Sequence, residues 1–331
     1  MFIIENYSTA VFFCFITMIC WGSWANTQKL TASSWRFELF YWDYVWGIVL
    51  TSLLFGLTLG STGEDGRRFI EDLTQAESKN IISAIIGGII FNAANILLVA
   101  AISIAGMSVA FPVGIGLALV IGVIVNYLDN PVGNKLILFS GVGLVVVAIL
   151  LNAYAYRRKS GNAKSVSAKG LILSILAAIL MGFFYRYVAS SMFPDFKNPI
   201  AGMLSPYSSV FLFSIGILVS NFVFNSLLMQ KPFVGTPVSY SHYFSGKTKD
   251  HLLGILGGMI WCIGMSFSII ASGKAGPAIS YGLGQGATVV AALWGIFIWK
   301  EFKGSPKGTS TILAIMLLLY VVGLTAIILA R

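Results

Sequence analysis

The residues of this sequence that could bind a small molecule are a few amides inside long apolar runs. Asn92 and Asn95 lie one helical turn apart, so both could face one cavity, and Gln285 stands between Gly284 and Gly286. Polar groups in lipid are costly unless they are hydrogen-bonded. A polar ligand could satisfy these amides, and so could a neighbouring helix. The sequence leaves both alternatives open.

Aromatic side chains offer a second kind of contact. Trp21 and Trp24 are three residues apart on one face of an apolar run. They could stack on a planar ring or on the face of a sugar, or they could pack in the core. The complete set of expected substrate contacts is Trp21, Trp24, Asn92, Asn95, Tyr281 and Gln285.

Asp43 is the one acidic residue within the first turn of an expected membrane span, which makes it the candidate proton carrier. Its alternative role is that of a helix N-terminal acid favoured by the macrodipole. The three cysteines lie singly in apolar runs, and His242 and His251 flank one loop. Because no catalytic triad, carboxylate pair or metal-ligand spacing occurs, we expect no enzyme activity, no metal and no cofactor.

The elements that must position these side chains are membrane helices. The chain is 57% hydrophobic and 10% charged, whereas a soluble domain carries about 25% charged residues. Its apolar runs are too long and too continuous for barrel strands. We expect an all-α polytopic membrane protein with ten spans, at 8–29, 41–61, 80–102, 107–127, 136–156, 169–190, 207–229, 251–271, 276–299 and 308–330.

Basic residues set the expected orientation. The net charge is +9, but the Lys and Arg residues lie in short connections between spans, which argues against nucleic-acid binding. Alternate connections hold 13 and 7 of them, and the richer side should be cytoplasmic. Both termini then lie outside the cell membrane, and the linker 157–168 lies inside.

Glycine pairs reveal an internal repeat. An offset of 170 relates Gly87-Gly88 to Gly257-Gly258, and offsets of 160 and 169 relate Gly22 to Gly182 and Gly47 to Gly216. The candidate packing or hinge glycines also pair at 170, and they are Gly114, Gly116, Gly284 and Gly286. Five spans per half make the repeat inverted, with halves 1–156 and 169–331. Substrate should bind between the halves, near the midplane.

The chain resembles the drug/metabolite transporter superfamily, and within it the ureide permease family, which borders on glucose/ribose and rhamnose porters. The resemblance rests on Trp42-Asp43-Tyr44, Gly87-Gly88 with Asn95, Asn126-Tyr127-Leu128-Asp129, Trp294-Gly295-Ile296 and Lys300-Glu301-Phe302. It implies uptake of a small polar metabolite with protons: a ureide, a nucleobase or another nitrogen heterocycle, or alternatively a monosaccharide. The plant family carries a long central loop with a phosphate-loop-like motif, which this chain lacks.

Two further classes stay open from the sequence. One is an exporter of drugs or lipids within the same superfamily, although a single intramembrane acid is little for binding cations. The other is a non-transporting receptor or scaffold, against which the lack of a soluble domain argues. The expected partners are the lipid bilayer, the substrate and protons, and the chain is expected to be a monomer or a homodimer.

Overall fold

Helices make up most of the described chain, which covers residues 1–105, 110–160 and 167–331 of this computed structural model. Among these residues, nine segments are long and apolar enough to cross a bilayer. They are α1 and α2 (Tyr7–Ser23, Ala25–Lys29), α3 (Phe37–Leu57), α5 (Ser78–Ala105), α8 (Lys135–Ser160), α9 (Ala168–Ser190), α10 (Pro206–Gln230), α12 (Thr248–Ala275), α13, α14 and η2 (Pro277–Gly284, Ala287–Leu293, Trp294–Ile298), and α15 (Thr309–Leu329). A tenth apolar segment is shorter and consists of η1 (Phe111–Gly116) and α7 (Leu117–Asp129).

The prediction of a helical polytopic membrane protein is confirmed, and each expected span matches one segment. The second span differs at its start, because α3 begins at Phe37 and not at residue 41. The early start is possible because Arg36 pairs with Glu38 at 2.5 Å, so this acid enters the helix with its charge matched. Asp43 is therefore the seventh residue of α3, beyond the first turn where the macrodipole acts.

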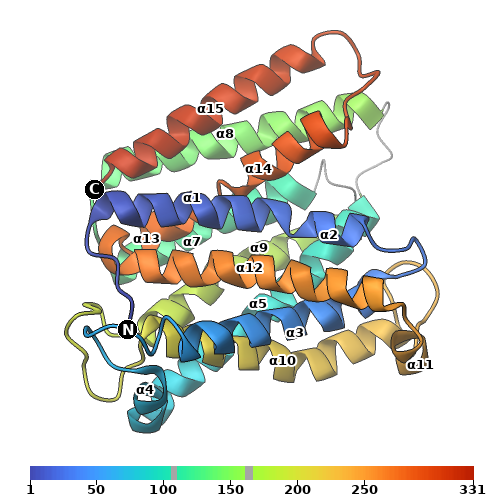
Figure 1. Cartoon of the computed structure of the whole chain (residues 1–331). Helices are drawn as coiled ribbons and strands as arrows, with labels where there is room; N and C mark the ends of the chain where they lie inside the picture. The colour runs from blue at the N-terminus through green and yellow to red at the C-terminus, as the bar shows by residue number, and fades with distance from the viewer. Residues whose placement is uncertain (106–109, 161–166) are drawn as a thin grey trace.

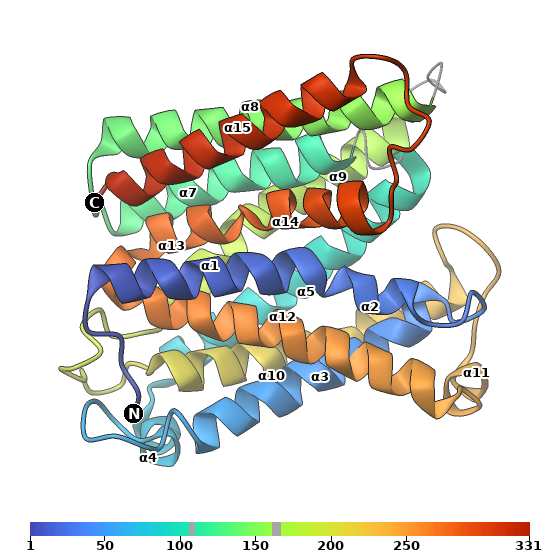
Figure 2. The same ribbon diagram turned by 45° about the horizontal axis from the view of Figure 1, so that its top comes forward.

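The spans run alternately between two ends of the molecule. Figure 1 shows both chain termini and the short helix α4 (Phe69–Gln75) at one end, and α11 (Tyr240–Phe244) at the other. Figures 1 and 2 agree that α8 and α15 form a pair along one side of the bundle. The linker 157–168 lies partly outside the described residues. The expected fourth span, 107–127, likewise begins outside them.

Helix breaks follow from glycine and proline. Gly276 has φ +82°, a left-handed conformation that ends α12, and Pro277 then occupies the first turn of α13. The ninth span is interrupted again at Gln285 and Gly286, which separate α13 from α14. A span broken in this way frees backbone groups and lets a side chain leave the helix surface at mid-depth.

Two close crossings join the helices at the core. A Cβ added to Gly258 of α12 would lie 1.9 Å from the Tyr44 carbonyl oxygen of α3. A Cβ added to Gly88 of α5 would lie 2.0 Å from the Phe213 carbonyl oxygen of α10. Only glycine permits such backbone approach. Since Gly88 and Gly258 are repeat equivalents, the two halves make equivalent contacts.

The same equivalence holds for the other glycine pairs. Added Cβ atoms would lie 2.2 Å from a carbonyl oxygen of the facing helix at both Gly47 (α3) and Gly216 (α10). At Gly22 the added atom would lie 2.5 Å from α14, and at Gly182 it would lie 2.5 Å from a side chain of α7. In both of these pairs each glycine therefore meets the equivalent helix of the other half, which supports the inverted repeat.

We predict that Gly258→Ala destabilises the protein by about 1–3 kcal/mol, because the added methyl group has to push α3 away from α12. The measurement is the apparent melting temperature of the purified protein in detergent. Gly143→Ala in α8 is the matched control, since a Cβ there meets nothing within 4 Å. Equal melting temperatures for the two variants would contradict the close crossing.

Candidate functional site

A cavity of about 330 Å³ lies among α1, α2, α5, η1, α9, α12 and α14. It is lined near the middle of α12 by Trp261, and it extends to Gln28 in α2 and Ile102 in α5. Helix α2 lies toward the end of the molecule that carries α11 (Figure 1). Of the six expected substrate contacts, four line this cavity: Trp21, Trp24, Asn95 and Gln285.

Aromatic rings form much of the wall. Trp21 and Trp261 are stacked with ring centroids 5.9 Å apart, and Phe91 lies 4.4 Å from Trp261. The Trp21 ring is held in place because its Nε1–H donates to the Trp261 carbonyl oxygen at 3.2 Å. Phe184 of α9 completes this part of the wall. Such a surface can stack on a planar ring or on the apolar face of a sugar.

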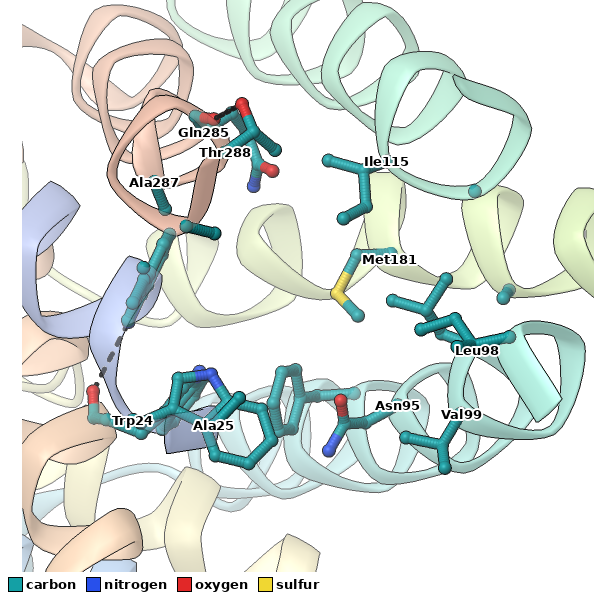
Figure 3. A pocket seen from close by; sticks show the side chains of 18 of the residues that line it. Trp24, Ala25, Asn95, Leu98, Val99, Ile115, Met181, Gln285, Ala287 and Thr288 are labelled. Atoms are coloured by element: carbon teal, nitrogen blue, oxygen red, sulfur yellow. Dashed lines mark hydrogen bonds between the residues drawn. The ribbon is translucent and has the colours of Figure 1, made fainter. Parts of the chain in front are cut away.

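Two amides face each other across the cavity. Figure 3 shows Asn95 and Gln285 on opposite walls, with both side chains pointing into the space between them. Asn95 donates its Nδ2–H to the Tyr41 hydroxyl at 3.1 Å. Within the described chain, neither the Asn95 Oδ1 nor the Gln285 side-chain amide has a hydrogen-bond partner. Both are therefore available to a ligand.

The lining of this cavity is electrically neutral. None of the described residues that line it is charged, and its polar groups are amides, Thr288 and indole N–H groups. Removing a charged ligand from water without a countercharge is strongly unfavourable. The cavity is thus suited to a small uncharged molecule with hydrogen-bonding groups.

The other two expected contacts point elsewhere. Asn92 is fully buried between helices, where its amide bonds to Tyr41 and to Ser220 of α10. Tyr281 is also fully buried, and its hydroxyl donates to the carbonyl oxygens of Met181 at 3.1 Å and Ala118 at 3.2 Å. Neither residue is among those that line the cavity, so the structure places both in helix packing.

The four candidate hinge glycines have different surroundings. Gly114 lines the cavity. A Cβ at Gly284 would lie 2.8 Å from the Trp21 ring, and one at Gly286 would lie 2.8 Å from Met18, so both allow α1 to pack closely. At Gly116 an added Cβ would make only ordinary contact, at 3.7 Å from Ile149.

Asp43 lies apart from this cavity, in a cluster at the end that carries α11. Its carboxylate accepts hydrogen bonds from the Tyr243 hydroxyl at 2.7 Å and from His251 Nδ1 at 3.0 Å. Burial, together with the carboxylate beside it, raises the pKa of Tyr243. The carboxylate is itself buried, and Trp35 packs edge-on against His251. The expected proton carrier therefore has a histidine and a tyrosine as direct partners.

A second cavity, of about 540 Å³, lies toward the end that holds the termini. It is lined by Asp129 of α7 and Arg186 of α9, which form an ion pair, and by Pro277 at the start of α13. Helices α9 and α12 line both cavities, each with residues from a different part of its length.

A hydrogen-bonded layer separates the two cavities along α9, α12 and α13. The Tyr185 hydroxyl donates to the Ser268 carbonyl oxygen at 3.1 Å, and the Ser280 hydroxyl donates to the same oxygen at 2.6 Å. Residues before Tyr185 in α9 line the first cavity and residues after it line the second. The first cavity is therefore closed toward the end that holds the termini.

The substrate contacts expected from the sequence leave out three aromatic residues of the wall: Phe91, Phe184 and Trp261. Each of these residues has an aromatic repeat equivalent that also lines the cavity. Phe91 and Trp261 are related by the offset of 170, and Trp24 and Phe184 by the offset of 160. An aromatic residue that recurs at the repeat offset is therefore a sign of a wall position.

Relatives of known name share most of the length of this chain. Ureide permease 1 of Arabidopsis thaliana is 23% identical over 99% of this chain and 98% of its own length. The glucose uptake protein GlcU of Bacillus subtilis (strain 168) is 24% identical over 72% of this chain and 75% of its own. The putative ribose uptake protein RbsU of Latilactobacillus sakei is 24% identical over 76% and 80%.

A solved crystal structure has the same fold, with a TM-score of 0.65 at 16% identity over 97% of this chain and 96% of that chain. The family model described as Ureide permease matches residues 40–169 and 157–331 of this sequence. These two segments cover the cavity walls contributed by α5, α9, α12 and α14, and they take in most of the protein. The chain therefore belongs to the ureide permease family.

Proposed function

We propose that this protein is a secondary active transporter that imports a small uncharged polar metabolite by alternating access. The substrate is a ureide, a nucleobase or a related nitrogen heterocycle. The observation that carries the proposal is the neutral cavity of stacked aromatic rings and two opposed amides, which is closed toward one end of the molecule. Sites of this kind at the interface of inverted repeats are typical of secondary transporters.

The lining chemistry matches the chemistry of these compounds. Ureides and nucleobases are small and contain planar amide groups, which present N–H donors and carbonyl acceptors at their edge. Trp21 and Trp24 offer rings for stacking, while Asn95 and Gln285 offer hydrogen bonds at opposite walls. Family membership favours the same class of substrate.

A monosaccharide is the second candidate substrate. The relatives named for glucose and ribose uptake support it. The same wall could stack on the C–H face of a sugar, and the amides could bind its hydroxyl groups. Direct competition between the two classes decides which one the site prefers.

The proposed orientation places the basic connections in the cytoplasm and both termini outside the cell membrane. The first cavity then faces the cytoplasm, and the second cavity, beside Arg186 and Asp129, faces outward. Import requires that the hydrogen-bonded layer at Tyr185 opens outward while the first cavity closes.

Proton coupling is proposed to use Asp43. Its carboxylate is buried and can exchange a proton with His251, which is within hydrogen-bonding distance, while the Tyr243 hydroxyl donates a hydrogen bond to it. Asp43 does not touch the cavity, so its charge would act on the substrate site through helix α12. The close packing of Gly254 against the Asp43 side chain makes that link direct.

Proteoliposomes that contain the purified protein should take up labelled allantoin or uracil, and an excess of unlabelled glucose or ribose should compete weakly. Uptake of the sugars alone would favour the second candidate. No uptake of any of the four compounds, with or without a pH gradient, would contradict the transporter proposal.

Gln285→Leu is predicted to raise the KM for the transported compound roughly 5- to 10-fold, because it removes one hydrogen bond to an uncharged group. Gln230→Leu is the matched control, since Gln230 is exposed at the end of α10 and lies outside the cavity. An unchanged KM in Gln285→Leu would remove this residue from the binding site.

Asp43→Asn is predicted to abolish accumulation driven by a pH gradient but to leave exchange of labelled for unlabelled substrate, which requires no net proton movement. Asp250→Asn is the control, because Asp250 is a buried acid at the same end of α12 that accepts from the Ala32 backbone N–H at 2.9 Å. Accumulation equal to wild type in Asp43→Asn would exclude this residue as the proton carrier.

A further inference from the structure

We infer that Tyr41 and Asn92 fix the orientation of the Asn95 amide so that only its carbonyl oxygen faces the cavity. The site therefore selects molecules that present an N–H or O–H donor at this wall. Tyr41 is a positioning residue, because it acts on the ligand only through Asn95. The inference rests on the proposed function, in that the cavity has to bind an uncharged polar ligand.

The orientation is set from the backbone of α10. Carbonyl oxygens only accept hydrogen bonds. The Ser220 hydroxyl donates to the Gly216 carbonyl oxygen at 2.8 Å, so its own oxygen is left to accept. Asn92 therefore turns its NH₂ group toward α10, where it donates to Ser220 Oγ at 2.9 Å and to the Ile217 carbonyl oxygen at 3.3 Å. The Asn92 Oδ1 must then point the other way, toward Tyr41.

The directions of the two hydrogen bonds made by Tyr41 follow from its single proton. A tyrosine hydroxyl has a single proton, and Tyr41 donates it to Asn92 Oδ1 at 2.9 Å. The Tyr41 oxygen can then only accept from its next neighbour, and it does so from Asn95 Nδ2 at 3.1 Å. With its NH₂ group held by Tyr41, Asn95 presents Oδ1 to the cavity.

The burial of these residues fixes the direction of each hydrogen bond. Tyr41 and Asn92 are fully buried and Asn95 is 5% exposed, so water cannot replace any of these hydrogen-bond partners. Reversing one amide would set two acceptors or two donors against each other in a dry environment, which is costly. The crossing at Gly88 and Gly216, one helical turn before Asn92 and Ser220, holds α5 and α10 at the required distance.

In the described part of the other half, the repeat equivalents of Asn92 and Ser220 are not hydrogen-bonded to each other. The repeat offsets relate Asn92 to Cys262 and Ser220 to Thr51. The Thr51 hydroxyl oxygen has no hydrogen-bond partner within the described chain. The Gln285 side-chain amide likewise has no hydrogen-bond partner within the described chain, so it can rotate to offer either its NH₂ group or its carbonyl oxygen to a ligand. Selection for a donor therefore belongs to the Asn95 wall alone.

The test measures binding of uracil, 1-methyluracil and 3-methyluracil to the full-length protein in detergent, by quenching of the tryptophan fluorescence of the cavity wall. Each methyl group replaces one N–H donor. We expect wild-type protein to bind at least one methylated compound roughly tenfold more weakly than uracil. In Tyr41→Phe and in Asn92→Leu that ratio should fall severalfold, because the Asn95 amide is then free to reverse.

Asn92→Leu gives the sharper result, since it leaves the Tyr41 proton free to bond with Asn95 Oδ1 and turn the NH₂ group to the cavity. Tyr44→Phe is the matched control: it lies one turn further along α3, is fully buried, and its hydroxyl has no partner among the described residues. This variant should keep the wild-type ratio.

The outcomes separate a positioning role from a structural one. A merely structural defect weakens the binding of all three compounds by the same factor and leaves the ratio unchanged. Unchanged ratios in both Tyr41→Phe and Asn92→Leu would therefore overturn this inference and leave the proposed function standing. If wild-type protein binds none of the three compounds, the proposed heterocycle transport fails first, and the inference fails with it.

Discussion

Backbone contact at glycine is the constraint on which this structure depends. Lipid provides no hydrophobic force that drives apolar helices together, so their association relies on close packing and hydrogen bonds. The crossings of α3 with α12 and of α5 with α10 meet this need, because Gly258 and Gly88 let carbonyl oxygens of the facing helix occupy the space of a side chain. The hydrogen bond from Asn92 to Ser220 exists only because α5 and α10 approach this closely.

Because the crossings are repeated, the walls of the cavity are repeated as well. Phe91 faces its equivalent Trp261 at 4.4 Å, and Trp24 has its equivalent in Phe184. The polar groups break this symmetry, since the residue equivalent to Gln285 is Ile115, which lines the same cavity. Duplication thus supplies the shape of the cavity, and single substitutions in one half supply its specificity.

The sequence predicts the spans well, because a helix in lipid must be long, apolar and internally hydrogen-bonded. Four of its expected substrate contacts, Trp21, Trp24, Asn95 and Gln285, line the cavity, and their depth or polarity stands out against their surroundings. It could not separate Asn95 from Asn92, one turn away, because their difference depends on Tyr41 and Ser220, which belong to other helices. Aromatic wall residues such as Phe91 were missed for another reason: an aromatic side chain inside an apolar run carries no local sign that it faces a cavity.

The separation between the neutral cavity and Asp43 constrains how a proton could be coupled to transport. A carboxylate among the cavity residues would bind the proton and the substrate in one place, but the charged cluster lies at the start of α12. His251 and Trp261 both belong to α12. Gly254, which packs closely against Asp43, lies between these two residues in the sequence. Protonation of Asp43 would weaken its bond to His251 and release this end of α12 from α3. Movement of α12 would then reach Trp261 and the stacked rings of the wall directly, so the coupling needs no polar path through the membrane core.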